Sequence, residues 1–548
     1  MSKVVRLSGL ATAVVLVAMT AGVAPRASAA DKKERARAER ALREGEFAVA
    51  EKIYRELVER DLKDLPARLG LSYAQLKQRN LRDAYDNAAR AIALDATSAR
   101  AHAILGSALL ASGDFPLSVE EFKTALSFDE NEALAVAGLS MVNLYENRTQ
   151  AALAGLRRAV DLDPNEPDFV FSFAQAAARS ERFKEAADAY ETFLRIAPRT
   201  DADRRARIRG LIDFLRFIAI QGELYQTGGA QRVQVPFDLV NSRPIIPVRL
   251  NGSKKALRFV VDTGSGMSVV SDETARRLGI KTVARGGLAR AVGGGGRFEI
   301  VYGFLDSFQI GDARVSNVPV YIREFHSSQE PVDGYIGLSV LSHFVATVDY
   351  GEHVFSIVRD DARPAAGGEQ AAAAAGASAA PQIADAPQPS PRRVFEIPIR
   401  STSSGFWSGL VRVEGVSKPT NFIIDTGATV SVVSTQLAER ETLSRFEQKF
   451  RLSVFGAAGV TEDVPLLMLP RVTVGEYVQA NLAAAVLDMD PLNETSGFEQ
   501  AGIIGGNLLR FFRVTFDFRR GLLRLEMIPN FTPAPISKDA SVTPQGLE

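Results

Sequence analysis

Cysteine is absent from this chain of 548 residues, and histidine is scarce. Without a thiol the protein has no disulfide bond, no cysteine nucleophile and no thiolate metal site. The four histidines show neither an H-E-x-x-H pattern nor another clustered ligand spacing, so we expect no metal site. A G-x-S-x-G nucleophile elbow and a G-K-[ST] phosphate loop are also missing. The sequence therefore predicts neither a metal nor a cofactor.

The chain also lacks a charge imbalance and long hydrophobic runs beyond its N-terminus. Lys and Arg number 65 and are balanced by 65 Asp and Glu, so we expect no nucleic-acid partner. No apolar run after Val23 is long enough to span a membrane. The apolar fraction of 46% suffices for several globular cores, and the length predicts three or four domains.

A seven-residue motif does occur twice. Residues 259–265 are F-V-V-D-T-G-S, and residues 422–428 are F-I-I-D-T-G-A. In both copies a carboxylate ends an apolar run, which is costly in a protein core unless the carboxylate is paired or used. We therefore expect Asp262 and Asp425 to be each other's partner.

The two copies agree well beyond this motif. Each continues with S-V-V-S, and its final serine, Ser271 or Ser434, is a predicted N-cap for the short amphipathic segment that follows. A small-residue loop comes next, and then a segment of two apolar residues and a glycine, Gly337 or Gly505. The small residues of the loops include Gly293, Gly294, Gly295 and Gly296 in the first copy, and Gly456 and Gly459 in the second.

This ordered series resembles the retropepsin-like aspartic peptidases, which include retroviral proteases and a branch of bacterial envelope proteins. The resemblance covers residues 244–358 and 394–528. It implies two all-β lobes, and because retroviral enzymes dimerise, two copies in one chain look like a fused dimer. The implied activity is that of an aspartic endopeptidase with one active site per chain, a polypeptide substrate and no cofactor.

The resemblance also assigns roles to individual residues. It implies that Asp262 and Asp425 are catalytic, that the glycine-rich loops form flaps over the substrate, and that Gly337 and Gly505 support the catalytic loops. The loop residues with supporting roles are Thr263, Gly264, Ser265, Thr426, Gly427 and Ala428. Two adjacent carboxylates hold one proton between them. Because only Asp262 has a serine three residues later, we expect Asp425 to be protonated more often.

Competing interpretations attach to the same residues. Two further repeated acidic residues, Asp349 and Asp517, occupy predicted turns, where Asp commonly bonds its own backbone, so we expect them to be structural. The run Gly293–Gly296 is also consistent with a plain flexible loop. A degenerate double barrel that binds peptides without cutting them remains the alternative to a peptidase.

The N-terminus has the order of a secretory signal peptide. Lys3 and Arg6 precede an apolar stretch that ends at Val23, and small residues follow up to Ala29. We expect residues 1–29 to be removed, which predicts an exported protein, periplasmic or secreted, in a bacterial envelope. An uncleaved signal would instead anchor the chain to the membrane.

Residues 31–225 contain a repeat of 34 residues. Apolar and small residues recur at this interval, among them Leu71, Leu105, Leu139 and Phe173, and Ala50, Ala84, Ala152 and Ala186, with Ser118 in the missing slot. The pattern resembles the tetratricopeptide repeat (TPR), and it implies an all-α solenoid with a capping helix at 201–224 and a concave surface for a protein partner.

Composition places linkers between these units. Residues 225–232 are expected to be a short flexible linker, and residues 361–393 a disordered Ala/Pro-rich one. The predicted lobes are 233–360 and 394–530, followed by a tail at 531–548. The long linker favours pairing of the two lobes within one chain over homodimerisation. A further possibility is that the repeats keep the peptidase inactive until a partner binds them.

Overall fold

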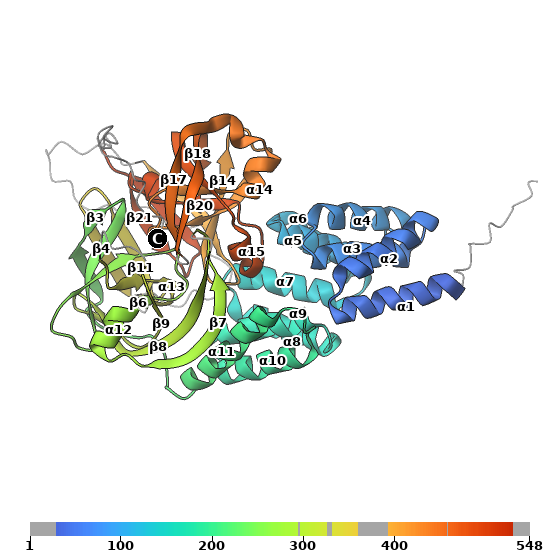
Figure 1. The fold of residues 1–548 in the computed structure, drawn as a ribbon, viewed down its shortest axis with the longest axis horizontal. Coiled ribbons are helices and arrows are strands. Elements are labelled where there is room, and N and C mark those ends of the chain that lie inside the picture. The colour runs from blue at the N-terminus through green and yellow to red at the C-terminus, as the bar shows by residue number, and fades with distance from the viewer. Residues whose placement is uncertain (1–28, 294–295, 326–330, 360–392, 457–458, 530–548) are drawn as a thin grey trace, which may run out of the picture.

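The computed structural model describes residues 29–293, 296–325, 331–359, 393–456 and 459–529. The helical part of the chain lies beside two β-lobes (Figure 1). This element order confirms the predicted fold class. The predicted signal peptide up to residue 28, the linker at 361–392 and the tail at 531–548 lie outside the described residues. None of the described helices combines the length and the apolar character needed to cross a membrane.

The N-terminal helices form antiparallel pairs whose close packing depends on small side chains. The recurring positions of the 34-residue repeat are completely buried, namely Ala50, Ala84, Ser118, Ala152 and Ala186. The Ser118 hydroxyl donates to the Phe115 carbonyl at 2.8 Å, so the polar member of this set is satisfied within its own helix. The helices are α1 (Ala29–Glu44), α2 (Phe47–Arg60), α3 (Leu65–Lys77), α4 (Leu81–Leu94), α5 (Ala99–Ala111), α6 (Phe115–Phe128), α7 (Ala133–Tyr145), α8 (Thr149–Leu162), α9 (Pro167–Arg179) and α10 (Phe183–Ile196).

A polar network connects α3, α5 and α9. The Tyr73 hydroxyl on α3 donates to Glu166 at 2.7 Å, and Lys77 contacts Glu166 and Asp168 at 2.7 and 2.6 Å. Arg100 on α5 lies 4.8 Å from the centre of the Tyr73 ring. Because Glu166 caps the start of α9, these contacts hold α3 against a helix far along the solenoid.

The first lobe is a curved sheet in which strands distant in sequence are neighbours. The strand order is β1-β9-β6-β10-β5-β4-β8-β7, with β3 beside β4. The elements are β1 (Gln226–Gly229), β3 (Asp238–Val240), β4 (Arg243–Leu250), β5 (Leu257–Val261), β6 (Val269–Ser271), α12 (Asp272–Leu278), β7 (Thr282–Arg290), β8 (Arg297–Ile310), β9 (Ala313–Arg323), β10 (Gly334–Ile336) and α13 (Leu338–Leu341).

The second lobe repeats this plan. Its strand order is β17-β18-β19-β16-β20-β15-β14, and β15 and β20 pair in parallel as β5 and β10 do. Ser271 and Ser434 cap the helices that follow them, as predicted. The elements are β14 (Trp407–Val413), β15 (Thr420–Ile424), β16 (Ser431–Ser434), α14 (Thr435–Arg440), η2 (Leu443–Phe446), β17 (Glu447–Gly456), β18 (Gly459–Val474), β19 (Tyr477–Leu487), α15 (Asp490–Ser496), β20 (Gly502–Ile504) and α16 (Gly506–Leu509).

Strands from both lobes form a shared sheet. Its centre is the antiparallel pair β11 and β21, where the hydroxyls of Thr347 and Thr515 lie 2.9 Å apart. Backbone pairing across the junction fixes the lobes relative to each other. The shared strands, in order, are β13 (Val394–Ser401), β22 (Leu522–Met527), β21 (Phe512–Asp517), β11 (Phe344–Asp349), β12 (Val354–Arg359) and β2 (Arg232–Pro236).

The prediction of a flexible linker at residues 225–232 is wrong. Residues Gln226–Gly229 form β1, which pairs antiparallel with Ala313–Ser316 of β9, and Arg232 begins β2. The segment lacks the apolar alternation of a strand, and its hydrogen bonds come from an edge of the sheet that the local sequence does not reveal. The solenoid is therefore joined to the first lobe through ordered strand pairing.

The solenoid also packs against the second lobe. Arg179 at the end of α9 donates to the hydroxyl of Ser401 at 2.8 Å and to the carbonyl of Thr402. The Phe498 ring lies edge-on to Phe115 and Tyr145, with centroids 4.9 and 5.1 Å away. The repeats thus contact both lobes.

Candidate active site

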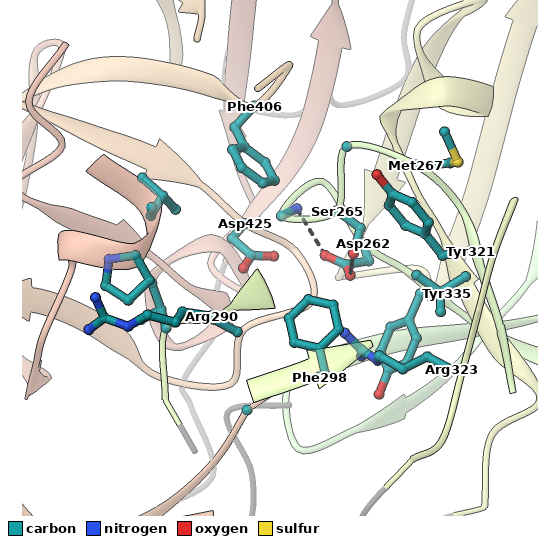
Figure 2. A pocket seen from close by; sticks show the side chains of 18 of the residues that line it. Asp262, Ser265, Met267, Arg290, Phe298, Tyr321, Arg323, Tyr335, Phe406 and Asp425 are labelled. Carbon is teal, nitrogen blue, oxygen red and sulfur yellow. Dashed lines mark hydrogen bonds between the residues drawn. The ribbon is translucent and has the colours of Figure 1, made fainter. Parts of the chain in front are cut away.

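Two equivalent strands place the repeated carboxylates. Asp262 directly follows β5, and its N–H donates to the Ile336 carbonyl at 3.1 Å. Asp425 follows β15, and its N–H donates to the Ile504 carbonyl at 2.9 Å. Both carboxyl groups thus emerge where the lobes meet, and they lie side by side in Figure 2.

The threonines after the two aspartates interlock across the junction. The Thr263 hydroxyl donates to the Ile424 carbonyl at 2.8 Å and accepts from the Thr426 N–H at 3.0 Å. Reciprocally, the Thr426 hydroxyl donates to the Val261 carbonyl at 2.6 Å and accepts from the Thr263 N–H at 3.2 Å. Both threonines are essentially fully buried, so this reciprocal set fixes the two loops relative to each other.

Each carboxylate is held by its own loop and touched by the opposite one. Asp262 accepts from the Gly264 N–H at 2.9 Å and from the Ser265 hydroxyl at 2.5 Å. Asp425 accepts from the N–H groups of Gly427 and Ala428 at 2.7 and 3.2 Å.

The glycines of the two loops allow this close approach. A Cβ on Gly264 would lie 2.2 Å from Asp425, and one on Gly427 would lie 2.5 Å from Asp262. Any larger residue at either position would therefore displace the opposite carboxylate.

The two carboxyl groups have different proton affinities. Burial raises the pKa of Asp262, while the Ser265 hydroxyl and a hydrogen bond from Asp425 act against this rise. Burial and the neighbouring charge of Asp262 raise the pKa of Asp425 well above its usual range. Of the two carboxyl groups Asp425 therefore has the higher proton affinity, in the direction expected from the Ser265 and Ala428 difference.

Removal of the Ser265 hydroxyl should shift the pH dependence of any reaction that needs ionised Asp262. The hydroxyl stabilises the charged form, so Ser265→Ala raises the Asp262 pKa and moves the acid limb of kcat/KM upward by about one pH unit. The alkaline limb, which reports Asp425, should move less. Exposed Ser342 provides the control Ser342→Ala. An acid limb that does not move in Ser265→Ala would contradict this assignment.

The predicted supporting glycines contact the loops directly. The Gly337 N–H donates to the Ser268 hydroxyl at 3.0 Å, and the Gly505 N–H donates to the Ser431 hydroxyl at 3.1 Å. The residue after each glycine also donates its N–H to the aspartate loop, at 2.8 Å in the first lobe and 2.7 Å in the second. The two segments thus buttress equivalent loops.

The predicted flap residues lie at the tips of two long hairpins. We define the first flap as β7 and β8 and the second flap as β17 and β18. Gly293 and Gly296 lie at the first tip, and Gly456 and Gly459 at the second, while Gly294 and Gly295 lie outside the described residues. A Cβ on Gly456 would come within 2.6 Å of the Val292 carbonyl oxygen, so the two tips are in contact.

A cavity of about 300 Å³ lies between the flaps and the two carboxylates. Its walls come from both lobes, and Figure 2 shows Phe406 on one side and Tyr321 on the other. The site therefore combines a shared acid pair with a mainly apolar cavity.

Family comparisons agree with this geometry. Residues 246–340 and 410–508 both match the model of the aspartyl protease family. Both lobes are therefore aspartyl protease-like domains. Residues 69–133 and 139–199 match the tetratricopeptide repeat model, so the helical region is a TPR domain.

The comparison with curated proteins gives no match. Among solved structures, the chain is similar to a TPR protein of Thermus thermophilus, with 19% identity and a TM-score of 0.29, covering 33% of this chain and 98% of that one. It is also similar to PilF of Pseudomonas aeruginosa, with 16% identity and a TM-score of 0.26, covering 34% of this chain and 85% of that one. At such TM-scores these likenesses add nothing to the family assignment.

Some cavity residues of the protease lobes were not predicted. Arg290 at the end of β7 pairs with Asp488 at 3.2 Å and with Glu494 at 3.3 Å, so it joins the first flap to the second lobe. Phe298 and Arg323 also line the cavity. Nothing in the local sequence marks these residues, because their positions depend on how the hairpins close.

The other repeated aspartates act within turns of the protease lobes. Asp349 accepts from the N–H groups of Gly351 and Glu352, both at 3.1 Å. Asp517 accepts from the Arg520 N–H at 3.2 Å. The expectation that both residues are structural is confirmed.

The first flap of the protease region rests on the last helix of the repeat region. Helix α11 (Ala202–Ile218) begins where Asp203 pairs with Arg297 at 2.5 Å, near the flap tip. Further along α11, Phe214 stacks on Tyr302 of β8 with centroids 4.2 Å apart. The helix therefore lies along the hairpin as well as packing on the final repeat (Figure 1).

Proposed function

We propose that the protein is an aspartic endopeptidase that hydrolyses peptide bonds with Asp262 and Asp425. The observation that carries this proposal is the pairing of two unlike carboxyl groups, one from each protease lobe, on the floor of one cavity. The family match supports the reaction class. The interlocked threonines support it further, because they hold both groups in fixed positions before a substrate enters.

The two groups have complementary parts in the reaction. Ionised Asp262 takes a proton from a water molecule while the oxygen of that water bonds to the peptide carbonyl carbon. Protonated Asp425 donates a hydrogen bond to the carbonyl oxygen while negative charge develops there. The tetrahedral intermediate then breaks its C–N bond, Asp262 returns its proton to the leaving nitrogen, and the products are a carboxylic acid and an amine. No covalent enzyme intermediate is required.

The test is cleavage of an unbiased peptide mixture by residues 31–548, followed by mass spectrometry between about pH 4 and pH 7.5. The double variant Asp262→Asn, Asp425→Asn is the control for contaminating proteases. New termini produced by the parent and absent with the double variant support the endopeptidase. A folded parent that cuts nothing favours the alternative of a non-catalytic peptide-binding scaffold.

We propose further that the TPR domain recruits a protein substrate or regulator. Leu94, Phe128 and Leu162 occupy equivalent places at the ends of α4, α6 and α8, and they are 40%, 47% and 36% exposed. A row of apolar side chains at the repeat interval is suited to a protein contact. Replacement of all three by serine should slow cleavage of a protein substrate and leave cleavage of short peptides unchanged. If the triple variant cleaves the protein substrate as fast as the parent does, the row does not recruit that substrate.

Export to the periplasm or the medium remains part of the proposal. It rests on the order of basic, apolar and small residues in positions 1–29. N-terminal sequencing of the protein from the periplasmic fraction should begin near Ala30 or Asp31. Recovery of the full-length chain in the membrane fraction would favour an uncleaved anchor.

A further inference from the structure

The two sides of the active-site cavity can be compared residue by residue, because the lobes share one strand plan. In the first lobe β6 pairs with β9, which sets Val269 opposite Tyr321 and Ser271 opposite Arg323. In the second lobe β16 pairs with β19, which sets Val432 opposite Ala485 and Ser434 opposite Leu487. Because the V-V-S segments of the two lobes are equivalent, the residues paired with them on β9 and β19 are equivalent as well.

By this strand register, Arg323 is the structural counterpart of Leu487, and Tyr321 is the counterpart of Ala485. The parallel pairs at β10 and β20 add Tyr335 as the counterpart of Ile503. Arg323, Leu487, Tyr335 and Ile503 all line the cavity. The cavity is thus symmetric in its backbone and asymmetric in its side chains.

The second-lobe side of the cavity is apolar. Leu487 and Ile503 are joined there by Val432, Leu492 and Phe406. Leu487, Val432 and Ile503 are buried, and they form one cluster that Phe406 and Leu492 complete. Such a wall favours an apolar side chain of the substrate, because transfer of apolar surface out of water is favourable.

The first-lobe side presents a guanidinium group among aromatic rings. The Arg323 guanidinium carbon lies 5.6 Å from the centre of the Phe298 ring and 5.8 Å from that of Phe325. Figure 2 shows Arg323 beside Phe298 and Tyr335, on the Asp262 side of the cavity. A guanidinium that lies against rings keeps its N–H edge directed at a carboxylate in a fixed geometry.

Arg323 also borders the space into which a bound peptide would extend. It lines a second cavity of about 500 Å³ beside the first flap. Arg276, Arg285 and Arg297 line this second cavity as well. Two charged residues line both cavities, Glu299 and Arg323, and Arg323 is the basic one.

We propose that the cavity selects asymmetric peptides, with an acidic side chain bound by Arg323 in the first lobe and an apolar side chain held by Leu487 and Ile503 in the second. This inference rests on the proposed peptide-binding function of the site. An acidic residue buried beside Asp262 needs a cationic partner, and Arg323 supplies one there. The mirror-related position offers only leucine, so an acidic side chain is disfavoured on that side.

The experiment compares octapeptides that differ only in one residue beside the central bond. The two peptides of the first pair have Leu-Glu and Leu-Gln at their centres, and those of the second pair have Glu-Leu and Gln-Leu. Two pairs are used because a bound peptide can run across the cavity in either direction. The parent should cleave the Glu member of one pair on the order of tenfold more efficiently in kcat/KM than the Gln member. Arg323→Leu should bring that ratio close to one.

Three variants make the comparison specific. Arg314→Leu removes an exposed arginine from the same strand, β9, and should keep the parental ratio. Arg323→Lys keeps the charge without the planar fork and should give an intermediate ratio. Leu487→Arg adds a guanidinium to the apolar side and should raise acceptance of a Glu-Glu centre. Ratios taken within one variant cancel any change that the loss of Arg323 causes in the acid pair itself.

Failure of this inference can be told apart from failure of the proposed function. The same peptides are titrated calorimetrically into the double variant Asp262→Asn, Asp425→Asn and into that variant with Arg323→Leu. Tighter binding of the Glu peptide that disappears with Arg323→Leu supports the acidic subsite even when the parent cuts nothing. Cleavage or binding without a Glu preference, or a preference that persists in Arg323→Leu, overturns this inference. The peptidase proposal is decided separately, by whether the parent cleaves any of the peptides.

Discussion

Asparagine in place of either Asp262 or Asp425 should lower kcat/KM for peptide hydrolysis by about 10³-fold or more. Asparagine at position 262 cannot accept a proton from the water molecule. Asparagine at position 425 can still donate a hydrogen bond, but it cannot share a proton with Asp262 as a carboxyl group does, so the acid pair is lost in both variants. Because the pair is formed by one residue from each lobe, both single variants should be equally inactive. Rates for each variant on one synthetic peptide provide the measurement.

Asp349→Asn is the matched control for loss of a repeated aspartate. Asp349 accepts two backbone hydrogen bonds in a turn, and its replacement should leave activity near the parental value. Mixing the two inactive single variants should not restore activity if each chain contains a complete site. Restored activity would instead indicate that lobes exchange between chains, and one active single variant would indicate a homodimeric site.

The acid pair was predictable because its contacts are local or duplicated. Asp262 accepts hydrogen bonds from Gly264 and Ser265, and Asp425 accepts them from Gly427 and Ala428, so these donors lie within three positions of their aspartate. Ser271 and Ser434 were predictable as N-caps for the same reason, because each hydroxyl accepts from the N–H three residues later in its own helix. A motif that contains its own hydrogen-bonding partners can be read from one copy, and a second copy identifies the partner across the lobes.

The surroundings of the pair depend on contacts that the sequence does not mark. Residues Gln226–Gly229 have the composition of a linker and become a strand only beside β9. Asp203 and Arg207 look like solvent-facing residues of a capping helix, yet Asp203 pairs with Arg297 and Arg207 donates to the Leu288 carbonyl at 3.0 Å. Arg323 acquires its place in the cavity only when β9 pairs with β6. In each case the partner is distant in sequence and belongs to a different element.

The contact between α11 and the first flap leads to the second large expected effect. Gly210 lies in the middle of α11, and a Cβ there would approach the Arg285 carbonyl oxygen to 2.0 Å and the Gly286 Cα to 2.4 Å. These atoms are backbone, so they cannot move aside as a flexible side chain would. Gly210→Ala should therefore separate α11 from β7 and displace the flap. A displacement of about 1 Å near bound substrate can lower kcat/KM on the order of 10²-fold.

Alanine favours helix more than glycine by about 1 kcal/mol, so weakening of α11 itself cannot explain a loss of activity in Gly210→Ala. Gly228→Ala on β1 is the matched control, because nothing lies within 4 Å of the added Cβ. Hydrogen exchange across β7 and β8 should quicken in Gly210→Ala and stay unchanged in the control. Parental activity in Gly210→Ala would show that the flap works independently of the repeats. A loss of activity together with faster exchange would show that the position of α11 against β7 controls the flap over the acid pair.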